Sequence, residues 1–126
     1  MNPDPEPTAA LSVDIKFWDE KIAVVTCIGE LDVYGAQKLR DAFTALNNQG
    51  LNRVLVDLSQ VSYIDSTGMG TMIGALKRTR SVGGSLDLAC NQEGLLRFFR
   101  GSGLTIVFRI FGSQAAARRS MPCRRT

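Results

Sequence analysis

The chain has 126 residues, of which 44% are hydrophobic and 21% charged, and its formal net charge is +3. This length and apolar content suit one globular domain with a single core. No apolar run approaches the roughly 18 residues that a membrane span requires, and residues 1–10 (MNPDPEPTAA) lack the basic and apolar regions of a secretory signal. Because these ten residues are rich in proline and acid, we expect a disordered lead-in.

The positive charge is concentrated at the C-terminal end. Residues 11–117 hold eleven Lys or Arg against ten Asp or Glu, whereas the last nine residues contain four arginines. The body of the domain is therefore close to neutral, and a nucleic-acid-binding protein more typically carries a basic face on the domain itself. We expect residues 11–117 to fold and residues 118–126 to form a flexible basic tail.

Three cysteines, Cys27, Cys90 and Cys123, show no spacing typical of a metal or redox site. Cys27 and Cys90 lie in strand-like runs, where a free cysteine behaves as a small core hydrophobe. We expect reduced thiols, which is the usual state in the cytoplasm.

The first elements predicted are a β-hairpin and a helix. Residues 13–18 and 22–28 are strand-like, and the short turn between them permits only an antiparallel pair. The second run, IAVVTCI, is apolar almost throughout, which is typical of a strand covered on both faces. After residues 29–32 (GELD) the period changes to that of a helix, which residues 47–50 (NNQG) end. The apolar stripe of this helix consists of Ala36, Leu39, Ala42, Phe43 and Leu46.

The remaining chain alternates strands with helices. Strands are predicted at residues 53–58, 86–89 and 105–111. Between the first two, Met69, Met72, Ile73 and Leu76 recur at helical spacing, and two glycines at 83 and 84 close that helix. A third helix, with Asn91 as its cap, has Leu95, Leu96 and Phe99 on its apolar face, and residues 114–119 predict a short final helix. This order predicts an α/β fold built on one mixed, mostly parallel sheet with an antiparallel edge strand and flanking helices.

The richest chemistry falls where a strand leads into a helix, at residues 61–70 (VSYIDSTGMG). Ser66 is expected in the first helical turn, where unpaired backbone N–H groups favour an anion by ~0.3–1 kcal/mol. A phosphate on Ser66 would therefore leave the fold intact, although Asp65 opposes it by repulsion. Gly68 and Gly70 keep the turn bare, so that another protein can approach the hydroxyl. A helix cap at Asp65 or Ser66 is the simpler interpretation, and it is compatible with phosphorylation.

Standard enzyme sites are missing from the sequence. There is no histidine, which excludes a Ser-His-Asp triad, and there is no P-loop string. The pair Gly68 and Gly70, followed by Asp87, is superficially similar to a dinucleotide-binding fingerprint. The third glycine of that fingerprint would fall at Ile73, however, and Gly74 is one place late. We expect neither an enzyme nor a cofactor.

Two signatures resemble the STAS family, and within it the antagonists of anti-sigma factors in bacterial sporulation and stress response. They are residues 29–34 (GELDVY) and residues 61–70, the latter similar to the family's phosphorylation motif almost letter for letter. A weaker likeness covers residues 84–104, and the whole resemblance spans roughly residues 11–112. It implies a single STAS domain.

The resemblance also implies a partner-switching cycle in the cytoplasm. In its unphosphorylated form, such an antagonist binds an anti-sigma factor with a GHKL-type serine kinase domain and thereby releases the sigma factor. The kinase phosphorylates the serine after the motif aspartate, here Ser66, and the phosphorylated form dissociates. A PPM-type serine phosphatase then restores the antagonist. Nucleic acid and membrane are not partners in this cycle.

The same resemblance implies a contact surface. Its members are Glu30, Asp32 and Tyr34 from the first signature and Asp65, Ser66, Thr67, Gly68 and Met69 from the second. Simpler roles remain open, since Asp32 could cap a helix, Tyr34 could pack, and Met69 and Met72 suit a core. Two alternative functions also remain open, namely a non-switching STAS scaffold of a signalling complex and a small nucleotide-binding protein.

The chain departs from the family pattern at two places. Met69 replaces the more usual leucine, which conserves volume. At the C-terminal end, residues 113–119 (SQAAARR) and a basic tail stand where the family has an acidic amphipathic helix. This departure predicts an unusual partner, if that helix contributes to partner choice.

Overall fold

The computed structural model describes residues 10–18 and 21–121, and it shows a five-stranded sheet with four helices in that part of the chain. The strands are β1 (Ser12–Trp18), β2 (Ile22–Leu31), β3 (Arg53–Ile64), β4 (Ser85–Ala89) and β5 (Ile110–Phe111). The helices are α1 (Val33–Asn48), α2 (Ser66–Ser81), α3 (Glu93–Gly101) and α4 (Gln114–Ser120). The lead-in predicted at residues 1–10 lies, except for Ala10, outside the described residues, as do residues 122–126 of the predicted tail, with Cys123.

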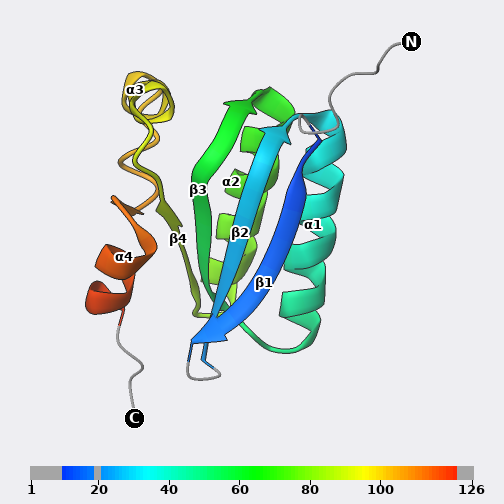
Figure 1. Ribbon diagram of the computed structural model, residues 1–126. Coiled ribbons are helices and arrows are strands. Elements are labelled where there is room, and N and C mark those ends of the chain that lie inside the picture. The colour runs from blue at the N-terminus through cyan, green and yellow to red at the C-terminus, as the bar shows by residue number, and fades with distance from the viewer. Residues whose placement is uncertain (1–9, 19–20, 122–126) are drawn as a thin grey trace.

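The sheet has the order β1-β2-β3-β4-β5 (Figure 1). β1 pairs with β2 in antiparallel fashion, and the other three pairs are parallel. The predicted α/β fold with an antiparallel edge strand is therefore confirmed. Because the parallel strands all end at the same edge, the turns that follow β2, β3 and β4 gather there.

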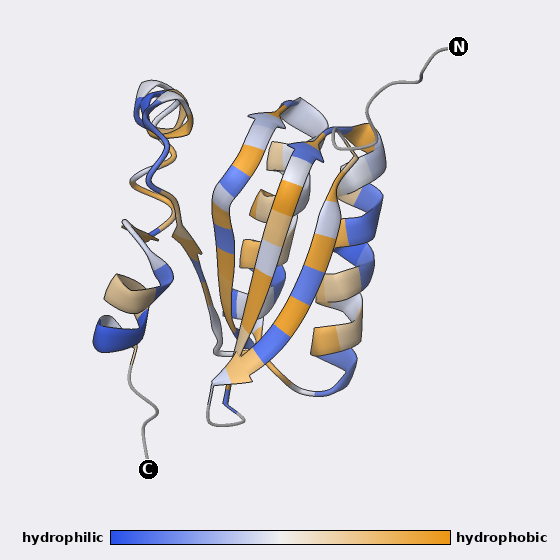
Figure 2. Cartoon of the chain, in the orientation of Figure 1, coloured by the Kyte–Doolittle hydropathy of each residue, from blue (hydrophilic) through white to orange (hydrophobic). Residues whose placement is uncertain are grey.

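The core lies on both faces of β2, because alternate side chains of a strand point to opposite faces. Helices α1 and α2 cover one face (Figure 1), where Val25 and Cys27 belong to the larger hydrophobic cluster. On the other face, Val24 packs in a smaller cluster with Ala117 of α4 and Met121. Figure 2 accordingly shows hydrophobic residues along most of β2, whereas β1 alternates hydrophobic and hydrophilic residues. Burial of Cys27 and Cys90 as free thiols confirms their role as small core residues.

Two strands extend beyond their predicted ends. β2 continues through residues 29–31, and β3 continues from Leu58 to Ile64. The first residues of both signatures therefore belong to strands rather than to loops. The two extensions stabilise each other, since Gly29 pairs with Val61 and Leu31 with Ile64. Register shifts after Thr26 and Gly29 accommodate the irregular stretch, and the φ of Gly29, 113°, lies in the left-handed region.

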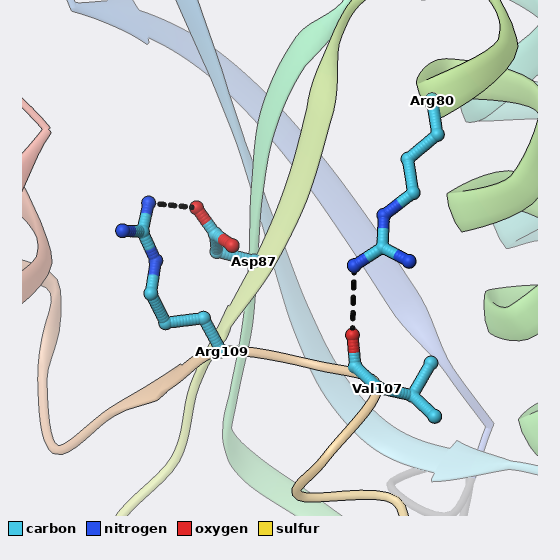
Figure 3. Close-up of polar contacts among 4 residues, drawn as sticks. All are labelled: Arg80, Asp87, Val107 and Arg109. Atoms are coloured by element: carbon cyan, nitrogen blue, oxygen red, sulfur yellow. Dashed lines mark hydrogen bonds and ion pairs between the residues drawn. The ribbon is translucent and has the colours of Figure 1, made fainter.

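The predicted strand at residues 105–111 is wrong for most of its length. Only Ile110 and Phe111 pair with β4, whereas the backbone N–H groups of Val107 and Phe108 both bond to the carbonyl of Leu104 in tight turns. Arg80 of α2 holds this segment in place by donating a hydrogen bond to the Val107 carbonyl at 3.1 Å (Figure 3). Tertiary contacts thus override the strand-like pattern TIVFRIF.

The end of the sheet beyond β4 differs from the prediction in one further detail. The residue that precedes α3 as its cap is Gln92 rather than Asn91, and it makes no side-chain capping bond. The short final helix is confirmed as α4, which Ser113 caps by accepting a hydrogen bond from the Ala116 N–H.

Across residues 10–18 and 21–121, no helix is both long and apolar enough to cross a membrane.

Candidate functional site

Two similar turns form the centre of the site, one between β2 and α1 and one between β3 and α2. Leu31 and Ile64, the last residues of β2 and β3, are direct neighbours in the sheet. Each is followed by an aspartate, Asp32 or Asp65, and then by a helix of 16 residues. The backbone N–H of Asp65 also donates to the Leu31 carbonyl at 3.3 Å, which ties one turn to the other.

Both aspartates cap their helices with the same geometry. Asp32 Oδ1 accepts a hydrogen bond from the Gly35 N–H at 2.8 Å, and Asp65 Oδ1 accepts one from the Gly68 N–H at 2.9 Å. Asp32 accepts a second bond, from the Tyr34 N–H at 3.1 Å. The capping roles considered for these two residues are therefore real, and each carboxylate lies at the positive end of a helix dipole.

Each turn also requires glycine at the third position after its aspartate. A Cβ atom on Gly35 would lie 2.6 Å from the Glu30 carbonyl oxygen, and one on Gly68 would lie closer still to the Leu31 carbonyl oxygen. Because both obstacles are backbone atoms, they cannot rotate away as a side chain would. The two helices therefore start against the strands at a distance that no larger residue permits.

Ser66 is the first residue of α2 and is exposed, as is Thr67 beside it. The buried side of the same turn holds Gly68 and Met69, the latter only 6% exposed. The structure thus separates the predicted contact residues into two groups. Ser66 and Thr67 face solvent, whereas Met69 packs in the core with Met72 and can affect a partner only through the shape of the turn.

Exposed apolar side chains surround the two turns. Tyr34 is 80% exposed, so it does not pack on its own domain, and Val33, Tyr63 and Ile28 are each about half exposed. Tyr63 pairs with Glu30 across β2 and β3. The sequence interpretation missed Val33, Tyr63 and Ile28. Val33 had a usable signal, because it follows Asp32 just as Ser66 follows Asp65.

A small cavity of about 260 Å³ opens beside the first turn. Its lining consists of Ala10, Leu11, Glu30, Asp32, Tyr34, Gly35 and Lys38. Lys38 Nζ donates to the Leu11 carbonyl at 2.8 Å, which fixes the start of the described chain against α1. The cavity brings together Glu30, Asp32 and Tyr34, the three residues predicted from the first signature.

Behind the site, a polar link joins the two helices. Arg40 of α1 donates to Thr71 Oγ1 at 3.0 Å, and that hydroxyl donates to the Thr67 carbonyl at 3.1 Å. Thr71 is buried, so the chain of bonds is shielded from water along part of its length. The first turn of α2 is therefore held from the α1 side as well as from the sheet.

Features of a metal site, a nucleotide site or a reactive cysteine also bear on what the described residues can do. Within residues 10–18 and 21–121, no three His, Cys, Asp or Glu side chains form a cluster that could hold a metal ion. Gly68, Gly70 and Gly74, on which the nucleotide-binding alternative rested, lie inside the continuous helix α2. Burial, followed by the charge of Asp57, raises the pKa of Cys27 to about 12, and burial also raises that of Cys90. Both thiols therefore stay protonated near neutral pH and are poor nucleophiles.

A family model described as the STAS domain matches residues 18–117. An anti-sigma-B factor antagonist of Bacillus subtilis is 40% identical over 94 residues, which cover 75% of this chain and 84% of that protein.

Two solved structures share the fold. The first is an anti-sigma factor antagonist from Mycobacterium paratuberculosis, with a TM-score of 0.81 and 19% identity over 91% of this chain and 96% of that one. The second is the Bacillus cell fate determinant SpoIIAA in its phosphorylated form, with a TM-score of 0.69 and 21% identity over 87% and 100% of the two chains.

Proposed function

Since this chain belongs to the STAS domain family, we propose that it is an anti-sigma factor antagonist controlled by phosphorylation of Ser66. In its unphosphorylated form it binds an anti-sigma factor and releases the sigma factor. The curated relative from Bacillus subtilis carries the name of such an antagonist. We assign the chain no catalytic activity of its own, and we expect it to act in the cytoplasm.

The exposed hydroxyl of Ser66 in the first turn of α2 is the observation that carries this proposal. A phosphate there meets the unpaired N–H groups of a helix start, which favour an anion. The Asp65 carboxylate beside it already balances part of that positive end. The added charge is therefore nearly neutral for the fold, and its main effect falls on a protein that covers the turn.

The surface that meets the anti-sigma factor combines both turns. Glu30, Asp32 and Tyr34 contribute from the first turn, and Asp65, Ser66 and Thr67 contribute from the second. We add Val33 and Tyr63, because the centre of an interface is typically apolar, with aromatic residues enriched, and polar groups form its rim. Gly68 and Met69 support this surface from beneath, since both are buried.

The partners follow from the same cycle. The anti-sigma factor has a GHKL-type serine kinase domain, which transfers the γ-phosphoryl group of ATP to Ser66 Oγ while the hydroxyl proton goes to a base of the kinase. A PPM-type phosphatase returns Ser66 to its free form by hydrolysis. Neither nucleic acid nor a membrane takes part.

Phosphorylation by the cognate anti-sigma kinase tests the proposal. With ATP and magnesium, we expect phosphopeptide mapping to place one phosphate on Ser66. Ser66→Ala should abolish the modification, whereas Thr67→Ala should retain it, and the two variants are well matched because both side chains are exposed in the same turn. Phosphate on Thr67, or on neither residue, would refute the assignment.

A further inference from the structure

Strand β3 extends well beyond its neighbour β4. Their pairing ends where Asp57 faces Ala89, whereas β3 continues to Ile64 with only β2 beside it. From residue 58 onward, the edge of β3 that faced β4 has no strand partner. This unsupported stretch leads directly to Asp65 and Ser66.

Buried backbone carbonyls on such a stretch need hydrogen-bond donors from elsewhere. Leu58 and Val61 are both fully buried. The side chain of Gln92 supplies the donors, because its Nε2 atom lies 3.1 Å from the Leu58 oxygen and 2.5 Å from the Val61 oxygen. A primary amide has two N–H bonds, and here both are directed at β3.

The side chain of Gln92 bonds to β3 in place of the capping bond that its position would allow. Gln92 precedes the first residue of α3, where a side chain usually caps its own helix. Its side chain makes no such bond, although its backbone carbonyl accepts a hydrogen bond from the Leu96 N–H at 3.0 Å. The side chain of Gln92 therefore connects the segment between β4 and α3 to β3, while the Gln92 backbone still starts the helix.

We propose that Gln92 is a positioning residue for Ser66, a role that rests on the proposed function of that serine. The hydrogen bond from Asp65 N–H to the Leu31 carbonyl holds the end of β3 on the β2 side. Gln92 holds β3 on the opposite side, three residues before Ile64. Together the two contacts fix where β3 ends and therefore where the Ser66 hydroxyl is presented to the kinase.

A matched control exists in the same molecule. Gln114 is also half-buried, and its Nε2 donates to Asp57 Oδ2 at 2.6 Å and to Thr26 Oγ1 at 3.4 Å. These contacts lie on β2 and β3, but upstream of the unsupported stretch. Gln92→Met and Gln114→Met therefore both remove an amide that bonds to the sheet, and only the first removes support near Ser66.

Hydrogen exchange is the first measurement. In Gln92→Met we expect the amides of residues 62–66 to exchange about tenfold faster than in the wild type, and in Gln114→Met we expect no change there. Gln92→Glu retains the shape of the side chain without its donors and should behave like Gln92→Met, which guards against an effect of methionine itself. Unchanged exchange at residues 62–66 in both Gln92 variants would overturn the proposal.

Phosphorylation kinetics provide the second measurement, made at equal concentrations of folded protein. A less fixed acceptor hydroxyl spends less time in the reactive geometry, so kcat should fall about fivefold in the Gln92 variants while KM changes less than twofold. Equal kcat in Gln92→Met and Gln114→Met would reduce Gln92 to a structural residue and overturn the proposal. Absence of phosphate on wild-type Ser66 would instead refute the proposed function, and the exchange result would then show separately whether Gln92 fixes β3.

Discussion

The two turns of the site have the same construction and different chemistry. Both join a strand to a helix of 16 residues, and both use an aspartate cap with glycine three residues later. They differ in the residue that follows the aspartate, which is Val33 in the first turn and Ser66 in the second. The backbone geometry therefore creates two equivalent exposed positions, and one side chain decides which of them can accept a phosphate.

A charge at Ser66 should produce the largest effect. A phosphoserine carries about −1.5 to −2 charges near neutral pH, and burying it under a partner without a basic receptor should weaken binding to the anti-sigma factor by at least about a hundredfold. Ser66→Asp should bind poorly and Ser66→Ala tightly, as measured by calorimetry. All forms should melt within a few degrees of one another, and equal affinities would rule out the switch.

Val33 tests whether the partner covers both turns. If the anti-sigma factor covers both turns, Val33→Asp should weaken binding in the manner of Ser66→Asp, whereas Val33→Ser should have little effect. Because Val33 is more than half exposed, neither change should affect stability by more than about 0.5 kcal/mol. Full affinity of Val33→Asp would show that only the second turn is covered.

Alanine at either glycine should break the geometry that the turns share. Gly35→Ala and Gly68→Ala each place a methyl group against a backbone carbonyl oxygen, and we expect a loss of about 2–3 kcal/mol in the free energy of unfolding. Gly70→Ala is the control, because its Cβ meets no atom within 4 Å. In a helix this change should stabilise by about 0.5–1 kcal/mol. Urea denaturation distinguishes the three variants.

Tyr34 should affect binding without affecting the fold. Its side chain is 80% exposed, so Tyr34→Ala should leave the melting temperature nearly unchanged. Loss of an aromatic anchor near the centre of the interface should lower affinity for the anti-sigma factor about tenfold, or about 1.4 kcal/mol. An unchanged affinity would remove the cavity beside the first turn from the contact surface.

The caps should show the smallest effects. Asp32→Ala and Asp65→Ala should each cost about 1 kcal/mol of stability, because each leaves helix N–H groups without an acceptor. Asparagine at either position retains the acceptor and should recover most of that loss. If the two alanine variants differ by more than about 1 kcal/mol in chemical denaturation, the two turns are not energetically equivalent.

The sequence alone predicted the parts of the molecule whose patterns are local. The hairpin, the apolar β2 and the helical stripe that includes Leu39 and Phe43 are confirmed. The extension of β3 was not predictable, because Ser59 and Gln60 interrupt the apolar pattern and only pairing with β2 restores the strand. The turns near Val107 depend in the same way on Arg80, which is distant in the sequence.

The residues of the candidate site also fall into two groups, those with a local sequence signal and those placed by tertiary packing. The residue types after each strand identified Asp32, Asp65 and Ser66, since caps and a helix start are local features. The inward direction of Met69 also had a local signal in the apolar stripe of its helix, whereas the outward direction of Tyr63 depends on how the strand packs and could be placed only in three dimensions. Gln92 belongs to this group too, because its partners Leu58 and Val61 lie more than thirty residues earlier. The assignment of Ser66 as phosphoacceptor stays a prediction until it is measured.

The edges of the sheet bear on how many copies of the chain act together. An unpaired strand edge invites pairing with another molecule and can lead to aggregation. Here β5 has only two residues, and β1 carries the exposed, oppositely charged Asp14 and Lys16. Both features are typical of edges that resist such pairing. We therefore expect a monomer that titrates its anti-sigma factor one for one, so that cellular concentration, rather than self-assembly, sets the response.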